Sequence, residues 1–126
     1  MHKSRLGGFI IDCQTEDLDA ATAFWSAALG LPSGPSLDPG GAKYRRLATA
    51  DDEPHLEVQA VTHPSRVHLD IETDDIPAEV ARLERLGAQR VGAVQDWVVM
   101  QAPTGQRFCV VRAQRADFER RAHRWP

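Results

Sequence analysis

Histidine and carboxylate side chains alternate with apolar residues at two places in the sequence, and they carry the clearest chemistry. His68 and Asp70 stand two residues apart in an apolar stretch, so an extended chain presents both on one face. A histidine beside a carboxylate can act as a general base, bind a metal or hydrogen-bond a substrate. The alternative is a structural role, in which both side chains satisfy neighbouring polar groups.

Glu57 stands in a similar alternating stretch. It shares one face with His55 and Gln59, while Leu56 and Val58 occupy the other. If the polar face lines a cavity, Glu57 can remove a proton next to a carbonyl group, whereas a solvated face would give it no role. We therefore take Glu57 and His68 as the candidate catalytic residues.

Four further residues are candidates for substrate binding: Asp12, Tyr44, Asp70 and Trp97. Tyr44 precedes two arginines, which suit an anionic substrate. The indole of Trp97 offers a wall for a flat ligand. Each has a structural alternative. The aspartates can hydrogen-bond neighbouring backbone groups, the tryptophan can pack in the core, and the tyrosine can lie on a solvated strand edge.

Composition narrows the class of protein. The chain has 126 residues and a net charge of −3, which predicts one globular domain, about residues 1–113. Five arginines against two acids give +3 in residues 112–126, leaving −6 for residues 1–111, so we expect no nucleic-acid partner. Apolar stretches are too short to cross a membrane, and the beginning lacks a signal-peptide core, which favours a cytoplasmic protein.

A repeat with a shift of 58 residues organises the chain. The matching polar pairs are Asp12 and Asp70, Thr15 and Thr73, and Asp17 and Asp75. Each stretch precedes a helical apolar stripe that ends in Leu-Gly, which predicts helices at Leu18–Leu29 and from Ile76 to Leu86. We expect the threonines to cap the helix starts, and Gly30 and Gly87 to adopt left-handed conformations at the ends.

Short strands follow each predicted helix. In the first half we expect a short extended piece near residues 31–33 and strands at residues 43–49 and 55–61. The corresponding strands of the second half are at residues 89–93, 97–102 and 107–112. The fold class is therefore α+β, with two βαβββ modules, about residues 6–61 and 66–113, whose curved mixed sheets surround a cavity. Residues 114–126 form a basic C-terminal tail.

These modules resemble the vicinal oxygen chelate superfamily, and most closely its glyoxalase-like domain proteins, relatives of glyoxalase I, bleomycin-resistance proteins and dioxygenases. The resemblance rests on the module order, on Ala23-Phe24-Trp25, on His68-Leu69-Asp70 and on the closing segment, residues 102–110. It implies a divalent metal (Zn, Ni, Fe or Mn) held at four positions, which here carry Ile10, Glu57, His68 and Cys109. Isoleucine cannot ligate a metal, so the implied set is His68, Glu57 and Cys109.

The resemblance leaves two main functions open. One is a metal-assisted or acid–base lyase or isomerase that acts on a small carbonyl or hydroxy compound. The other is a non-catalytic protein that binds a small, antibiotic-type molecule, as bleomycin-resistance proteins do. An accessory domain that docks a partner through the basic tail is a third. The incomplete ligand set argues against standard glyoxalase I or dioxygenase activity, and the resemblance also implies a homodimer.

Overall fold

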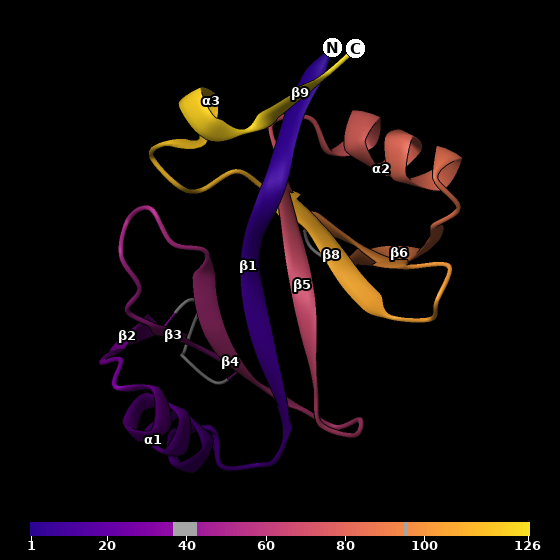
Figure 1. The fold of residues 1–126 in the computed structure, drawn as a ribbon. Helices are drawn as coiled ribbons and strands as arrows, with labels where there is room; N and C mark the ends of the chain where they lie inside the picture. The colour runs from indigo at the N-terminus through magenta and orange to yellow at the C-terminus, as the bar shows by residue number, and fades with distance from the viewer. Residues whose placement is uncertain (37–42, 95) are drawn as a thin grey trace. The chain divides into compact units, whose positions relative to one another are not determined.

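The predicted pair of βαβββ modules is confirmed in the computed structural model, which describes residues 1–36, 43–94 and 96–126 (Figure 1). The elements of the first module are β1 (His2–Gln14), α1 (Leu18–Leu29), β2 (Ser33–Ser36), β3 (Tyr44–Leu47) and β4 (His55–Val61). Those of the second are β5 (Arg66–Thr73), α2 (Ile76–Arg85), β6 (Gln89–Val94), β7 (Trp97–Gln101) and β8 (Arg107–Arg112). A short helix, α3 (Phe118–Arg121), and a strand, β9 (His123–Trp125), follow.

The chain forms two compact units, and strand β1 contributes to both. One unit comprises Gly8–Val67, and the other comprises Met1–Gly7 together with His68–Pro126. We call them the Gly8–Val67 unit and the terminal unit. None of the helices in the described parts of the chain has the length and apolar character needed to span a membrane.

In the Gly8–Val67 unit, the strands follow the order β2-β3-β4-β1. Strands β1 and β4 are parallel, and the other pairs are antiparallel. Helix α1 packs its apolar stripe against this sheet through a core of Leu18, Leu47 and Val58. The helix ends at Gly30, whose φ of 70° is the expected left-handed conformation.

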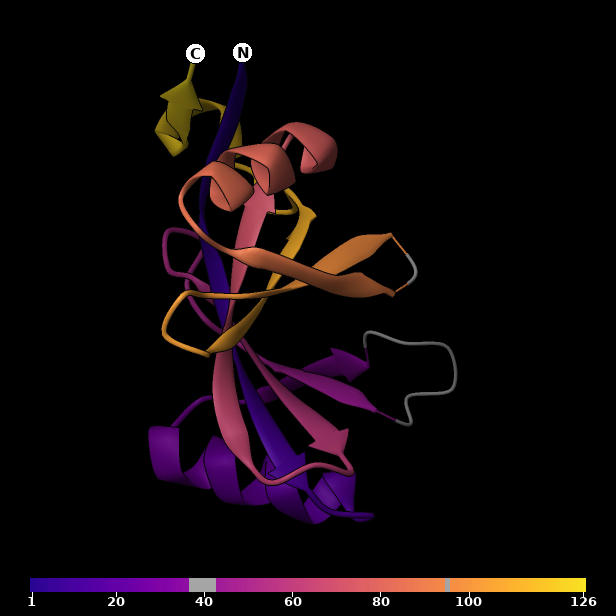
Figure 2. The same ribbon diagram turned by 90° about the vertical axis from the view of Figure 1, so that its right-hand side faces the viewer.

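In the terminal unit, the order is β5-β8-β7-β6, and β5 and β8 are parallel. Helix α2 covers one face of this sheet, and its core is formed by buried apolar residues: Val80, Leu83, Val98, Met100 and Val110. Pro77 lies in the first turn of α2, where its missing N–H costs no hydrogen bond. Strands β6 and β7 form an antiparallel hairpin (Figure 2).

The expected threonine caps were wrong. The carboxylates of Asp17 and Asp75 cap the two helices by accepting hydrogen bonds from Ala20 N and Ala78 N, each at 3.0 Å. The threonines lie two residues earlier, where the hydroxyl of Thr15 accepts a hydrogen bond from the backbone N–H of Asp17. The threonine thus fixes the turn before the helix, and the aspartate caps the helix itself.

Residues 114–126, expected to form a basic tail, pack within the terminal unit. Strand β9 pairs antiparallel with the start of β1, so both ends of the chain lie side by side (Figure 1). Phe118 of α3 is only 4% exposed. Glu72 accepts hydrogen bonds from Arg5 at 2.6 Å and Arg115 at 3.2 Å, and Arg5 also binds Asp117 at 2.6 Å. Side-chain pairing therefore holds this segment in place.

A second buried network joins the two ends of the chain to α2. Glu79 is fully buried and binds His2 at 2.7 Å and both nitrogens of the Arg82 fork at 2.7 and 2.8 Å. The Trp125 ring lies over the Arg82 guanidinium at 3.9 Å, and its indole N–H donates to Ser4. Burial alone would raise the pKa of Glu79, but hydrogen bonds from Arg82, His2 and Ser4 hold it below the ordinary value.

We expect Gly8→Ala to lower the free energy of unfolding by about 1–3 kcal/mol, the usual cost of overpacking. A Cβ at this position would lie 2.7 Å from the carbonyl oxygen of His55 on the neighbouring strand. Gly92→Ala is the control, because among the described residues a Cβ there meets no atom within 4 Å. Urea unfolding followed by tryptophan fluorescence measures both; equal stability of the two variants would contradict the close approach.

We expect Glu79→Gln to lower the free energy of unfolding by about 1–3 kcal/mol at neutral pH, because Arg82 and His2 lose a charged acceptor. Since the pKa of Glu79 is lowered on folding, its carboxylate stabilises the fold above the ordinary value of 4.5, and this stabilisation is lost as the pH falls below that value. The difference between wild type and variant should therefore shrink on acidification. Glu84→Gln, exposed on the same helix, is the control; a difference that stays constant with pH would contradict the assignment.

Candidate functional site

The parallel pairing of β5 and β8 positions the candidate site. Ile71 and Val110 are partners in this pair and both pack on the α2 side of the sheet. Because successive side chains point to opposite faces, Asp70 and Cys109, also partners, lie on the face away from α2. His68, two residues before Asp70, shares that face.

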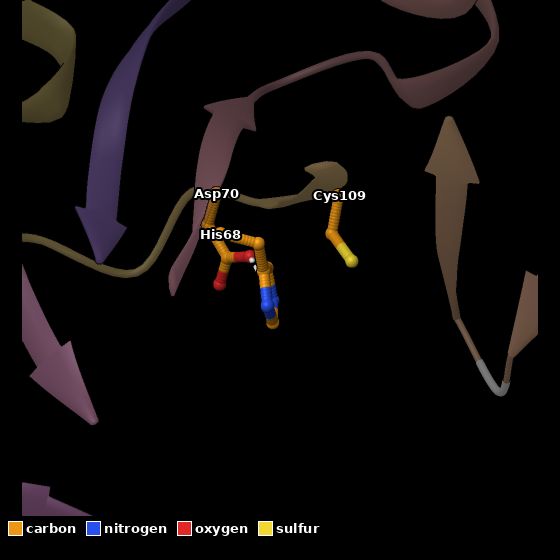
Figure 3. Close-up of side chains that lie close together, drawn as sticks. All are labelled: His68, Asp70 and Cys109. Atoms are coloured by element: carbon orange, nitrogen blue, oxygen red, sulfur yellow. Dashed lines mark ion pairs between the residues drawn. The ribbon is translucent and has the colours of Figure 1, made fainter. Parts of the chain in front are cut away.

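Three side chains converge there. One ligand atom from each of His68, Asp70 and Cys109 lies within 4.8 Å of the other two (Figure 3). His68 Nε2 is 3.6 Å from Asp70 Oδ1, an ion-pair distance when the imidazole is protonated. The side chains of His68 and Asp70 are 12% and 19% exposed, so the cluster is largely shielded yet reachable.

Strand β7 extends this face. Its buried residues Val98 and Met100 point into the core, so Trp97, Val99 and Gln101 lie on the same face as the cluster. Val99 is the partner of Cys109, and Gln101 is the partner of Arg107. Trp97 is half-buried at one end of β7, as suits the wall of a ligand site.

The Gly8–Val67 unit has its own polar face, formed by β3, β4 and β1. Arg46 donates to Glu57 at 3.1 Å, and Gln59 donates to the Tyr44 hydroxyl at 2.9 Å. Asp12 is nearly buried, and its carboxylate lies 3.8 Å from Arg66 Nε. The carboxylate of Glu57 therefore lies beside a guanidinium.

The four positions implied by the resemblance divide between the units. Ile10 and Glu57 are partners across β1 and β4 in the Gly8–Val67 unit, and Ile10 is 3% exposed. His68 and Cys109 belong to the terminal unit, where Asp70 joins them. Sequence reasoning placed Asp70 on the face of His68 but assigned it to substrate binding, and it missed Arg107 altogether.

Strand pairing explains why Asp70 joins the group. Glu57 of the first module and Cys109 of the second are matched as implied ligand positions. Their strand partners, Ile10 on β1 and Asp70 on β5, then match each other as well, at a shift of 70 − 10 = 60 residues along the sequence. The helix caps Asp17 and Asp75 correspond at a shift of 58. The second module is thus two residues shorter between strand and helix, and this offset brings Asp70 level with Cys109.

Both cysteines are outside disulfides. Cys13 packs at the edge of the α1 core, where burial raises the pKa of its thiol. Cys109 lies on the face of its sheet away from α2, beside two other potential ligands. Of the two cysteines, Cys109 is therefore the one that lies among other potential metal ligands in the described residues.

Comparisons with known proteins agree with this fold. A family model described as a glyoxalase-like domain matches residues 8–111. A comparison with curated protein sequences found no match.

Solved structures with the same fold include a hypothetical protein from Bacillus halodurans C-125, with 12% identity and a TM-score of 0.62 over 90% of this chain and 97% of that one. A variant of Streptomyces coelicolor methylmalonyl-CoA epimerase in complex with 2-nitronate-propionyl-CoA has 17% identity and a TM-score of 0.56 over 87% of this chain and 98% of that one. A methylmalonyl-CoA epimerase in complex with methylmalonyl-CoA and NH4+ has 17% identity and a TM-score of 0.57 over 88% of this chain and 96% of that one. At these identities the likeness concerns the fold alone.

Proposed function

Because the chain belongs to the glyoxalase-like domain family of the vicinal oxygen chelate superfamily, we propose that it is a metal-assisted lyase or isomerase that acts on a small carbonyl or hydroxy compound. The observation that carries the proposal is the convergence of His68, Asp70 and Cys109 on one face of the terminal unit. Two similar structures hold acyl-CoA compounds, whose thioester is a carbonyl group, and this agrees with the proposed substrate class.

The three donors suit a zinc ion. A nitrogen, an oxygen and a thiolate are ligands that zinc accepts, and catalytic zinc sites keep three protein ligands and one open position. Ligand atoms around a tetrahedral zinc lie about 3.3–3.8 Å apart, for bonds of about 2.0–2.3 Å, so a cluster within 4.8 Å needs only small side-chain rotations. A thiolate favours zinc, nickel or iron over manganese. A bound divalent ion would act as a Lewis acid toward a carbonyl or hydroxyl oxygen.

The chain's own residues have distinct tasks in this proposal. His68, Asp70 and Cys109 would hold the ion, and the half-buried Trp97 would pack against the substrate. Glu57 stays a proposed proton acceptor of the Gly8–Val67 unit, where Arg46 holds its carboxylate through the 3.1 Å hydrogen bond. Without a metal, Asp70 would orient the His68 imidazole, which would then accept the proton itself.

A binding protein without turnover is the second candidate. The observation that favours it is Ile10, which is buried and apolar at one of the four positions where the family's enzymes carry a ligand. In this case the same face of the terminal unit would hold a small molecule between Trp97 and the polar cluster, and no bond would be broken.

Removal of the thiolate tests the metal site. We expect Cys109→Ser to weaken Co²⁺ binding by more than about 100-fold, because loss of a residue that only supports a ligand already costs about 10-fold to 100-fold. The substitution should also abolish the thiolate-to-cobalt absorption band. Cys13→Ser is the matched control: burial raises the pKa of the Cys13 thiol, which disfavours the ligating thiolate, so its loss should leave the band in place. Titration with Co²⁺ followed by absorption measures both effects. A band that survives in Cys109→Ser would contradict the site.

The two candidate functions differ in turnover. We expect the zinc-loaded protein to exchange the protons next to the carbonyl group of hydroxyacetone or pyruvate in D₂O, measured by NMR. Glu57→Gln and His68→Ala should each slow this exchange by at least about 100-fold, the usual contribution of a positioned acid or base. His63→Ala, in the turn between β4 and β5, is the control. Unchanged exchange in both variants would overturn the assigned roles, and binding without exchange in the wild type would favour the second candidate.

A further inference from the structure

Arg107 is the cationic residue nearest in register to the candidate site. It stands on β8 two residues before Cys109, and the residue between them, Phe108, packs on the α2 side, so Arg107 shares the face of the cluster. Because Leu69 and Phe108 are partners in the parallel pair, the preceding residues His68 and Arg107 lie level with each other. Neighbouring strands are about 4.8 Å apart, so this cation and the cluster border the same patch of sheet.

The side chain of Arg107 is anchored without being neutralised. Its Nε donates to Oε1 of Gln101 on β7 at 2.9 Å, a bond to a neutral amide. Within residues 1–36, 43–94 and 96–126, no carboxylate pairs with Arg107, although other arginines of the chain are paired, as Arg46 is with Glu57. The anchor fixes the position of the guanidinium and leaves its two terminal nitrogens to bind a ligand.

The acids on the same face do not offset this charge. Glu72 lies two residues after Asp70 on β5 and therefore on the same face, but Arg5 and Arg115 already bind its carboxylate. A divalent ion held by the carboxylate of Asp70 and the thiolate of Cys109 has no net charge with these ligands. The positive charge of Arg107 then remains in a half-buried site, where it attracts an anion more strongly than it would in open solvent.

We infer that Arg107 binds a carboxylate of the substrate, which makes the substrate a small 2-oxo or 2-hydroxy acid instead of a neutral aldehyde or ketone. A guanidinium accepts a carboxylate through two parallel hydrogen bonds, and this fixes the direction of the molecule. The carbonyl or hydroxyl oxygen on the next carbon then faces His68, Asp70 and Cys109. The role of that oxygen rests on the proposed function, whereas the hydrogen bonds to the carboxylate come from Arg107, which Gln101 holds in place.

The test compares an anion with its neutral analogue. Pyruvate and pyruvamide differ in the carboxylate, and NMR titration of the zinc-loaded protein gives the dissociation constant of each. We expect the wild type to prefer pyruvate. Arg107→Gln, which keeps a polar side chain beside Gln101, should weaken pyruvate binding about 10-fold to 100-fold and leave pyruvamide binding unchanged. Arg107→Lys keeps the charge and should retain part of the preference, which guards against a variant that fails to fold.

Arg112→Met is the matched control, because Arg112 lies on the same strand, is exposed and pairs with Asp96 at 3.6 Å. Pyruvate binding should not change in it. The inference is overturned if Arg107→Gln binds pyruvate as the wild type does, if Arg112→Met loses as much affinity, or if the wild type does not prefer pyruvate to pyruvamide.

Failure of the metal site gives a different result. Arg107-dependent pyruvate binding in chelator-treated protein that takes up no Co²⁺ would support the carboxylate site and overturn the metal. A Cys109-dependent cobalt band combined with pyruvate binding that ignores Arg107 would support the metal and overturn the carboxylate site.

Discussion

The parallel pairing of β5 with β8 is the constraint on which the candidate site depends. Ile71 and Val110 pack under α2 from this pair, and a slip of one residue in either strand would turn that strand's core residue toward the opposite face. The same slip would carry Asp70 of β5, or Cys109 of β8, into the apolar core, where a carboxylate without a partner is costly. Core packing therefore fixes the register, and the register fixes which polar groups meet.

The same strand arrangement serves a different purpose in the Gly8–Val67 unit. There Ile11 and Val58 are partners in the parallel pair of β1 and β4, and both are buried. The opposite face carries acids as well, but each lies beside a guanidinium, Glu57 at 3.1 Å from Arg46 and Asp12 at 3.8 Å from Arg66. In the terminal unit the acid lies beside an imidazole and a thiol instead. The duplicated backbone thus carries two chemically different faces, and the group that could hold a metal ion lies on the terminal unit's face.

Local patterns in the sequence predicted the elements well. The bounds of α1, β4 and β8 follow from apolar periodicity and from the glycine and proline residues between them. The helix caps were assigned to the wrong residue because Thr15 and Asp17 both suit a cap, and the chain turns on the threonine before the helix begins. That choice depends on backbone angles that residue type alone does not fix.

Features that depend on distant residues were harder to predict. Alternation placed His68 and Asp70 on one face, but it could not show that Cys109 on another strand would lie beside Asp70, because register between strands is not a local property. Strand β9 was not expected for the same reason. It is held by β1 and by the contacts of Trp125 with Arg82 and Ser4, residues more than 40 and more than 100 positions away in the chain.

Pairing within the fold, more than composition, decides which charges can bind a ligand. The arginine-rich end of the chain left open a surface that docks a partner, yet Arg115 binds Glu72 and Arg112 pairs with Asp96. The acids of that segment are likewise engaged, Asp117 by Arg5 and Glu119 by Lys3. In the described residues beside the cluster, the cation with no acidic partner is Arg107, which lies outside that segment and is held by an amide. A half-buried charge that the fold fixes in place but does not neutralise costs solvation energy, and binding an anionic substrate would recover it.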